Sequence, residues 1–152
     1  MMAHVKVTTF LSLNGKAQEA ISFYQKNLDA KVRFQITNIE IQAKMDPEYT
    51  FPESEKDFVS HSVLEIGSSE LSIIDDTMDE GTDVVTGNNL SLCLYSSSLA
   101  QVTDFYERVT MDKRTKVIIP LGKNFFAEAY AIVKDPFGVI IQFAVQAEGE
   151  QR

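Results

Sequence analysis

Hydrophobic and polar residues follow regular patterns along this chain, and the patterns predict the same order of elements twice. Alternation over residues 5–13 predicts a strand with one apolar side. That side carries Val5, Val7, Thr9, Leu11 and Leu13, and the opposite side carries Lys6, Thr8, Phe10 and Ser12. Apolar positions at helical spacing then predict an amphipathic helix over 16–28, and a second strand follows over 31–36. The chain therefore starts as strand, helix and strand.

Two further short strands complete this first group. They are predicted over 61–66 and 70–75, and the Gly67-Ser68-Ser69 sequence between them is typical of a hairpin. The intervening segment 38–57 is acidic and contains two prolines, which predicts a loop with room for one short strand over 39–43. A lid, a dimer arm and a disordered loop all remain open for this segment.

After a polar linker over 77–88, the pattern begins again. Leucines at alternate positions predict a strand over 90–95. A helix is predicted behind Ser98, whose Ser-x-x-Gln spacing is that of a capping box. Three strands are predicted after this helix, over 116–121, 126–133 and 139–145. Both halves therefore follow the order β-α-β-β-β.

The two halves look like copies of one unit. Their helices carry matching Phe-Tyr pairs, Phe23-Tyr24 and Phe105-Tyr106, inside the same order of elements. Units of half this length do not bury a core alone, so duplication explains why both are present. We expect a single domain over 1–152, with one module at about 4–76 and a second at about 89–146.

A turn motif precedes the last predicted strand. In Asp135-Pro136-Phe137-Gly138, proline presets its φ angle, aspartate can accept bonds from nearby backbone, and glycine tolerates positive φ. The β-branched strand that follows holds one amide, Gln142. A polar group within such a strand is expected to face a partner side chain or a cavity.

Composition and charge narrow the possible functions. The formal net charge of -8, without any cluster of lysine and arginine, argues against a nucleic-acid partner. No apolar run approaches the ~18–20 residues of a membrane helix, and the N-terminus lacks a signal-peptide pattern, so we expect a cytoplasmic protein. Cys93 is the only cysteine, which excludes an intrachain disulfide; its leucine neighbours predict a buried, inert thiol.

Four segments resemble one superfamily. They are Asn14–Tyr24, Ser62–Asp75, Asn88–Leu92 and Pro120–Gly138, and they span most of the chain. In order and spacing they resemble the glyoxalase/bleomycin resistance/dioxygenase superfamily (the vicinal oxygen chelate proteins), and within it the PhnB-like branch. The resemblance implies an α+β fold in which two βαβββ modules form a curved, mixed, eight-stranded sheet around a cavity, with the helices outside. It also implies a homodimer, without indicating whether modules pair within or between chains.

The resemblance also implies four positions at which metal-dependent members hold their metal. These positions carry Thr9, Ile74, Ser91 and Gln142 in this chain, and a shift of one residue would replace Ile74 by Asp75. Hydroxyls and one amide hold a divalent transition metal poorly, because such metals prefer imidazole, thiolate or carboxylate donors. We therefore expect no metal and no cofactor, and this donor set argues against metal-dependent isomerisation and oxygenation.

The same register, together with alternation along the strands, predicts a cavity lined by a few polar groups among apolar ones, as in small-molecule sites. The predicted ligand-binding residues are Thr9, His61, Glu65, Ser91, Tyr95, Phe126, Glu128, Tyr130 and Gln142. Each also has a structural interpretation: a surface histidine, solvated carboxylates at sheet edges, a satisfied buried amide or core aromatics. No catalytic residue can be assigned from the sequence.

Three functions are consistent with these patterns. The first is a metal-free protein that sequesters or senses an amphiphilic small molecule. The second is a lyase, isomerase or dioxygenase-like enzyme with a non-standard site at His61 with Glu65 or Glu128. The third is a purely structural or protein-binding dimer. Proteins of the PhnB-like branch are sometimes labelled methyltransferases, but no glycine-rich nucleotide-binding turn follows the first strand.

Overall fold

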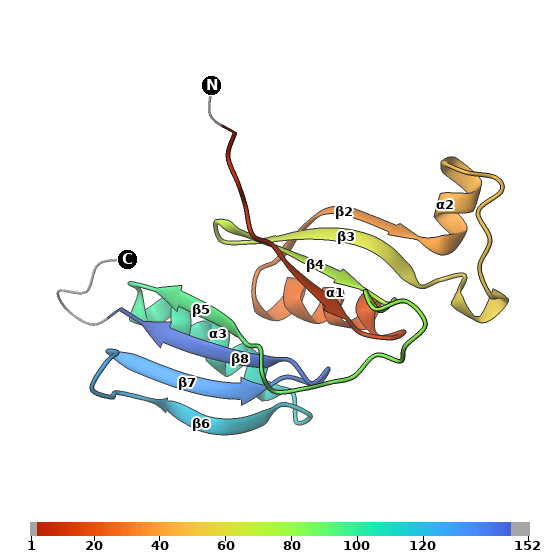
Figure 1. The fold of residues 1–152 in the computed structure, drawn as a ribbon. Coiled ribbons are helices and arrows are strands. Elements are labelled where there is room, and N and C mark those ends of the chain that lie inside the picture. The colour runs from red at the N-terminus through yellow and green to blue at the C-terminus, as the bar shows by residue number, and fades with distance from the viewer. Residues whose placement is uncertain (1–2, 147–152) are drawn as a thin grey trace. The chain divides into compact units, whose positions relative to one another are not determined.

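The computed structural model describes residues 3–146, and it contains two βαβββ modules (Figure 1). The chain separates into two compact units, Met1–Val84 and Val85–Arg152, each of which holds one module. The predicted α+β fold of two βαβββ modules is confirmed, and the eight strands are divided between two four-stranded mixed sheets. No helix within residues 3–146 is long and apolar enough to cross a membrane.

The first unit contains four strands, two helices and one 3-10 turn. In chain order these are β1 (Thr9–Ser12), α1 (Ala17–Asn27), β2 (Lys31–Thr37), α2 (Asn38–Lys44), η1 (Glu53–Glu55), β3 (Val59–Ile66) and β4 (Ser69–Ile74). The strand order in the sheet is β1-β4-β3-β2, with β1 parallel to β4 and the other neighbours antiparallel. The first strand is shorter than the predicted range 5–13.

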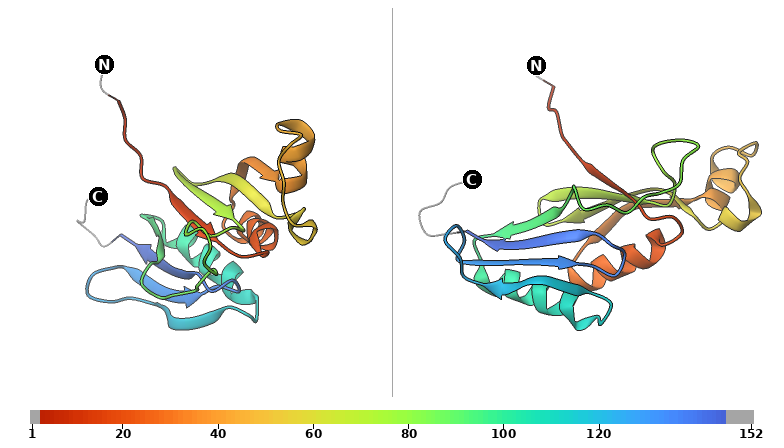
Figure 2. Two further views of the ribbon diagram at one scale, coloured as in Figure 1. Left: turned by 45° about the vertical axis from the view of Figure 1, so that its right-hand side comes forward. Right: turned by 60° about the horizontal axis from the view of Figure 1, so that its bottom comes forward.

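Helix α1 covers one face of this sheet (Figure 2). Its Ile21 and Tyr24 are fully buried, as are Leu64 and Ile73 of the sheet. The amide of Gln35 on β2 donates a hydrogen bond to Gln18 on α1, which identifies the face that the helix covers. We call this the α1 face, and we call the opposite face, which no helix of the unit covers, the first open face.

A buried carboxylate joins α1 to the sheet. Asp75, 3% exposed, follows β4 and accepts hydrogen bonds from three backbone N–H groups. Its Oδ1 accepts from Gly15 (2.7 Å) and Ala17 (2.9 Å), and its Oδ2 accepts from Val59 (2.8 Å). Two of these donors lie at the start of α1, where N–H groups lack helical partners. Asp75 therefore fixes the N-terminus of α1 against β3 and β4.

The prediction for segment 38–57 was wrong at its start, where the structure has a helix instead of a loop or strand. Ile39, Ile41 and Ala43 alternate as in a strand, but Thr37 and Glu40 form a complete capping box that starts α2. The remainder of the segment is ordered by Asn38, whose amide donates to the Glu55 carbonyl (2.8 Å) and accepts from the Tyr49 hydroxyl (3.1 Å).

Replacing Thr37 with alanine is expected to lower the free energy of unfolding of the α2 segment by about 1 kcal/mol, because the cap for the Glu40 N–H is lost. Hydrogen exchange of amides 38–44 measures this local change. Hydrogen bonds from Lys44 and Thr37 lower the pKa of Glu40, so its ionised form stabilises the folded segment above its ordinary pKa. The part of the stability difference between wild type and Thr37→Ala that depends on ionised Glu40 should disappear as pH falls through the lowered pKa of Glu40. Equal loss in the exposed control Thr8→Ala would contradict the capping role.

The second unit has the same plan without the extra helix. Its elements are β5 (Leu92–Ser96), α3 (Leu99–Met111), β6 (Lys116–Gly122), β7 (Ala129–Lys134) and β8 (Ile140–Val145), and its strand order is β5-β8-β7-β6. The side chain of Ser98 accepts a hydrogen bond from the Gln101 N–H, which confirms the predicted start of the helix. Strand β7 begins three residues after the predicted start, so Phe126 and Glu128 lie in the preceding loop.

Helix α3 covers one face of the second sheet (Figure 2). Tyr106 of the helix meets the buried Phe143 of β8 edge to face, with ring centroids 5.9 Å apart. Val102 and Val109 are buried on the same side of the helix. We call this the α3 face, and the opposite face of the sheet is the second open face.

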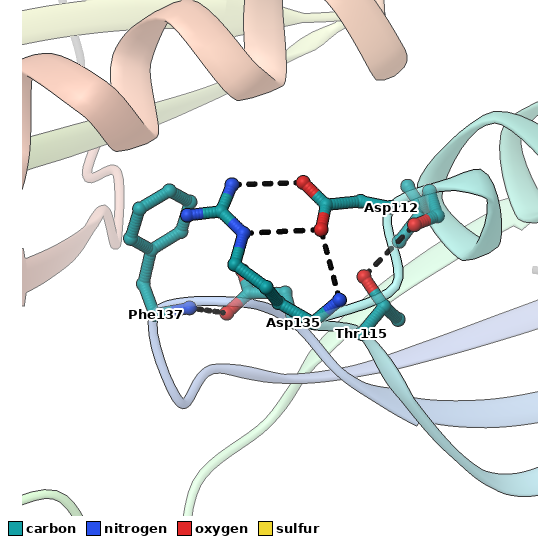
Figure 3. Close-up of polar contacts among 6 residues, drawn as sticks. Asp112, Thr115, Asp135 and Phe137 are labelled. Atoms are coloured by element: carbon teal, nitrogen blue, oxygen red, sulfur yellow. Dashed lines mark hydrogen bonds and ion pairs between the residues drawn. The ribbon is translucent and has the colours of Figure 1, made fainter.

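The predicted Asp-Pro-Phe-Gly turn is confirmed (Figure 3). Asp135 Oδ1 accepts from the N–H groups of Phe137 and Val139, both at 2.9 Å, and Gly138 has a φ of +88°. The loop after α3 contacts this turn, because Arg114 binds Asp112 through two nitrogens (3.0 and 2.8 Å) while its guanidinium lies 5.8 Å from the Phe137 ring centroid. This contact positions the start of β8, which carries Gln142.

Candidate functional site

Strand register places three of the second module's six predicted ligand-binding residues on the second open face. Residues paired across a ladder point to the same side of a sheet. Gln142 pairs with Cys93 on β5 and with Ile132 on β7. One row along, Ala144 lies between Tyr95 and Tyr130. Tyr95, Tyr130 and Gln142 therefore share the face that α3 leaves uncovered.

A hydrogen-bonded chain of three side chains runs across this face. The Tyr130 hydroxyl donates to Gln142 Oε1, and Gln142 Nε2 donates to Ser91 Oγ at 2.8 Å. Burial, with a smaller contribution from Cys93, raises the pKa of Tyr130, so the phenol keeps the proton that it donates. We call these three residues the polar chain. Tyr130 and Gln142 are half-buried and Ser91 is exposed.

Aromatic side chains extend from one end of the polar chain. The Phe126 ring lies 4.9 Å from that of Tyr130, and the Phe125 ring lies 5.1 Å from that of Phe126. Asn124 holds their loop, because its Oδ1 accepts from the N–H groups of Phe126 (3.0 Å) and Ala127 (2.8 Å). Phe126 is 42% exposed, so a large part of its ring is open to solvent. Glu128, at the end of this loop, is exposed.

The prediction of a buried Cys93 was wrong, since the thiol is exposed. Its neighbours Leu92 and Leu94 pair with Ile141 and Phe143 and so point to the α3 face. Alternation then turns Cys93 to the second open face, in the same row as Gln142. The apolar neighbours of Cys93 therefore indicated that the α3 face is buried, and not the face that carries Cys93 itself.

The first open face carries an aromatic group that the sequence patterns did not reveal. The imidazole of His61 lies between two rings, with centroid distances of 6.0 Å to Phe10 and 5.7 Å to Phe34. Both phenylalanines are 43% exposed. The sequence signal that could have revealed this group was the alternation over 5–13, because it places Phe10 opposite the apolar side of its strand. His61 is thus part of an exposed aromatic surface.

Thr9 is not grouped with His61 in the structure. It pairs with Leu71, which pairs in turn with Leu64 on the α1 face. The neighbouring Phe10 pairs with Ser72 and points to the first open face. Thr9 therefore lies on the α1 face of β1, and Phe10 lies on the first open face beside His61.

Glu65 is on the first open face, but its carboxylate is already paired with Arg33. Its Oε2 accepts a hydrogen bond from Arg33 Nε at 2.7 Å, and this bond is the main cause that lowers the pKa of the Glu65 carboxyl. The same contact raises the pKa of Arg33. An ionised carboxylate held by an arginine is poorly suited to donate a proton.

The side chains at the inherited metal positions do not fit a transition metal. Gln142 and Ser91 offer an amide and a hydroxyl that bind each other, and Ile74 offers no donor. Within residues 3–146, no three His, Cys, Asp or Glu side chains gather into a group that could hold a metal ion. The donor chemistry of these faces therefore gives no basis for a metal-dependent step.

Comparison with known proteins gives a family and a fold. The family model for the Glyoxalase/Bleomycin resistance protein/Dioxygenase superfamily matches residues 6–143. No curated protein shows significant sequence similarity to the chain.

Several solved structures are similar over nearly their whole length. Protein PA1353 from Pseudomonas aeruginosa has a TM-score of 0.73 and 22% identity, covering 94% of this chain and 98% of that one. The PhnB protein from Bacillus cereus, described as a putative 3-demethylubiquinone-9 3-methyltransferase, has a TM-score of 0.68 and 21% identity, with coverages of 93% and 99%. TioX from Micromonospora sp. ML1 has a TM-score of 0.59 and 12% identity, with coverages of 97% and 100%. At these identities the likeness establishes the fold alone.

Proposed function

This chain belongs to the glyoxalase/bleomycin resistance/dioxygenase superfamily, and we propose that it binds a small amphiphilic molecule without a transition metal, to sequester or sense it. The observation that carries the proposal is the second open face. There a polar chain of Tyr130, Gln142 and Ser91 lies beside the exposed ring of Phe126. Small-molecule sites commonly combine a few oriented polar groups with an apolar and aromatic lining.

The other residues predicted to bind ligand fit this proposal to different degrees. Tyr95 shares the second open face, and Glu128 lies at its border. On the first open face, His61 with its two phenylalanine neighbours offers a further aromatic contact surface. Thr9 has no place in the proposed contact surface, because it shares the side of Leu71.

The enzymatic alternative has less support. A lyase or isomerase built on His61 needs a carboxylate that can exchange a proton, and Glu65 accepts instead from Arg33 with a lowered pKa. Glu128 belongs to the other unit and is exposed. We therefore favour binding over catalysis. A homodimer and a cytoplasmic location stay predictions.

The proposal is tested by titration with N-phenyl-1-naphthylamine, a neutral amphiphile whose fluorescence rises in apolar surroundings. The chain has no tryptophan, so probe emission is free of indole background. We expect saturable binding that EDTA leaves unchanged. Phe126→Ala should weaken it about tenfold, because an aromatic contact contributes up to about 1.5 kcal/mol beyond its buried area.

Met111→Ala is the matched control, since it truncates an exposed apolar residue on α3. It should leave probe affinity within about twofold of wild type. Absence of saturable binding would overturn the proposal. Retention of one equivalent of Mn, Zn or Ni after gel filtration, with probe binding that depends on it, would favour the metal-dependent alternative.

A further inference from the structure

We propose that the polar chain selects ligands that carry a neutral hydrogen-bond-accepting oxygen, such as a ketone or amide carbonyl, next to an apolar ring. The inference rests on the proposed function of the second open face. It assigns ligand contact to Gln142 and Ser91 and a positioning role to Tyr130. The direction of the hydrogen bonds along the polar chain decides which groups remain for a ligand.

Hydrogen bonds to two other side chains of the protein, Tyr130 and Ser91, orient the Gln142 amide. A glutamine amide has an accepting end, Oε1, and a donating end, Nε2, with two protons. Tyr130 donates to Oε1 and therefore occupies one of the two lone pairs at the accepting end. Without that phenol, the amide could turn and offer either end to a ligand. Tyr130 thus holds Oε1 on its own side and directs Nε2 toward Ser91.

Two donors remain at the end of the polar chain. Gln142 Nε2 uses one proton on Ser91 Oγ, and no other hydrogen bond of this nitrogen is found among residues 3–146. Ser91 accepts that bond, so its own hydroxyl proton is directed elsewhere, and Ser91 is exposed. The polar chain therefore presents one N–H and one O–H, and an accepting oxygen on a ligand can bind both.

Charge favours a neutral ligand. None of the three side chains in the polar chain is ionised at neutral pH, and the whole protein carries a formal net charge of -8. A carboxylate or phosphate would meet repulsion without a cationic partner in the polar chain. The face carries Ile132 in the same row as Gln142 and Ala144 in the next row, and the Phe126 ring lies beyond Tyr130. These apolar groups suit a ring attached to a neutral carbonyl.

The test uses three naphthalenes of similar size as competitors of N-phenyl-1-naphthylamine. The first, 2-acetylnaphthalene, only accepts hydrogen bonds. The second, 2-ethylnaphthalene, neither accepts nor donates them, and the third, 2-naphthalenemethanol, both accepts and donates them. We expect wild type to bind the ketone about tenfold more tightly than the hydrocarbon, because the hydrocarbon leaves two donors without partners. Gln142→Met, which keeps the length of the side chain without its polar atoms, should abolish this preference.

Tyr130→Phe keeps the ring and removes only the phenol hydroxyl. We expect the ketone preference to fall about threefold and the affinity for 2-naphthalenemethanol to rise, because the released amide can present Oε1 to the alcohol. A merely structural role of Tyr130 would change all three affinities together. Ser91→Ala, at an exposed position, should lower the ketone preference and provides a second variant if Gln142→Met does not fold.

The outcomes separate the two proposals. If the fluorescent probe itself does not bind, the proposed function fails. If the probe binds and wild type treats the ketone and the hydrocarbon alike, only the inference about the polar chain fails. It also fails if the ketone preference persists in both Gln142→Met and Ser91→Ala.

Discussion

Replacing Asp75 with alanine is expected to lower the free energy of unfolding by about 3–5 kcal/mol, because each of three backbone N–H groups left without an acceptor costs about 1–3 kcal/mol. The carboxylate is 3% exposed and accepts from three backbone N–H groups, on Gly15, Ala17 and Val59. Alanine would leave these donors without acceptors at the N-terminus of α1. Urea unfolding followed by far-ultraviolet circular dichroism measures the change.

Asp75→Asn separates the contributions of the two carboxylate oxygens. An asparagine can keep Oδ1 on Gly15 and Ala17, but its Nδ2 then faces the N–H of Val59, donor against donor. We expect a loss of about 1–3 kcal/mol, smaller than for alanine. Asp76→Ala, an exposed neighbour, is the control and should change stability by less than about 0.5 kcal/mol. If Asp75→Ala lowered the free energy of unfolding by less than about 1 kcal/mol, Asp75 would not join α1 to the sheet as the structure indicates.

Phe143→Ala is the second large expected effect, with a loss of about 3–5 kcal/mol. The ring is fully buried on the α3 face and packs edge to face against Tyr106 at 5.9 Å, so truncation removes apolar burial and leaves a cavity. Protection of β7 and β8 amides from hydrogen exchange should fall along with the urea midpoint.

The matched control is the same substitution at an exposed phenylalanine. Phe125 is 96% exposed, so Phe125→Ala should cost less than about 0.5 kcal/mol. If the two variants lost equal stability, the assignment of Phe143 to the core of the second unit would be wrong. If Phe143→Ala unfolds during purification, Phe143→Leu keeps the comparison measurable.

Local sequence signals explain why much of the fold was predictable. Apolar spacing predicted α1 and α3 because a helix that covers a sheet must repeat its buried positions at its own period. The serine cap of α3 and the Asp-Pro-Phe-Gly turn were predictable because their hydrogen bonds link residues at most four positions apart. The wrong prediction at α2 came from two local signals in conflict. There a capping box at Thr37 and Glu40 outweighed a strand-like alternation.

The composition of the candidate faces depended on strand register, which no local signal encodes. A shift of one residue exchanges the two faces of a strand, and this explains why Phe10, and not Thr9, lies beside His61. It also explains the exposed thiol of Cys93, whose leucine neighbours both point to the opposite face.

By itself, the sequence determined the order of elements, the duplication, the turn before β8 and the superfamily, because each depends on patterns within short stretches. Only the tertiary structure decided which side chains share a face and which way their hydrogen bonds run. Tyr130, Gln142 and Ser91 come from β7, β8 and the approach to β5, and their contacts exist only once three strands are in register. Hydrogen bonds between distant segments need that register, since a side chain must lie within about 3 Å of its partner.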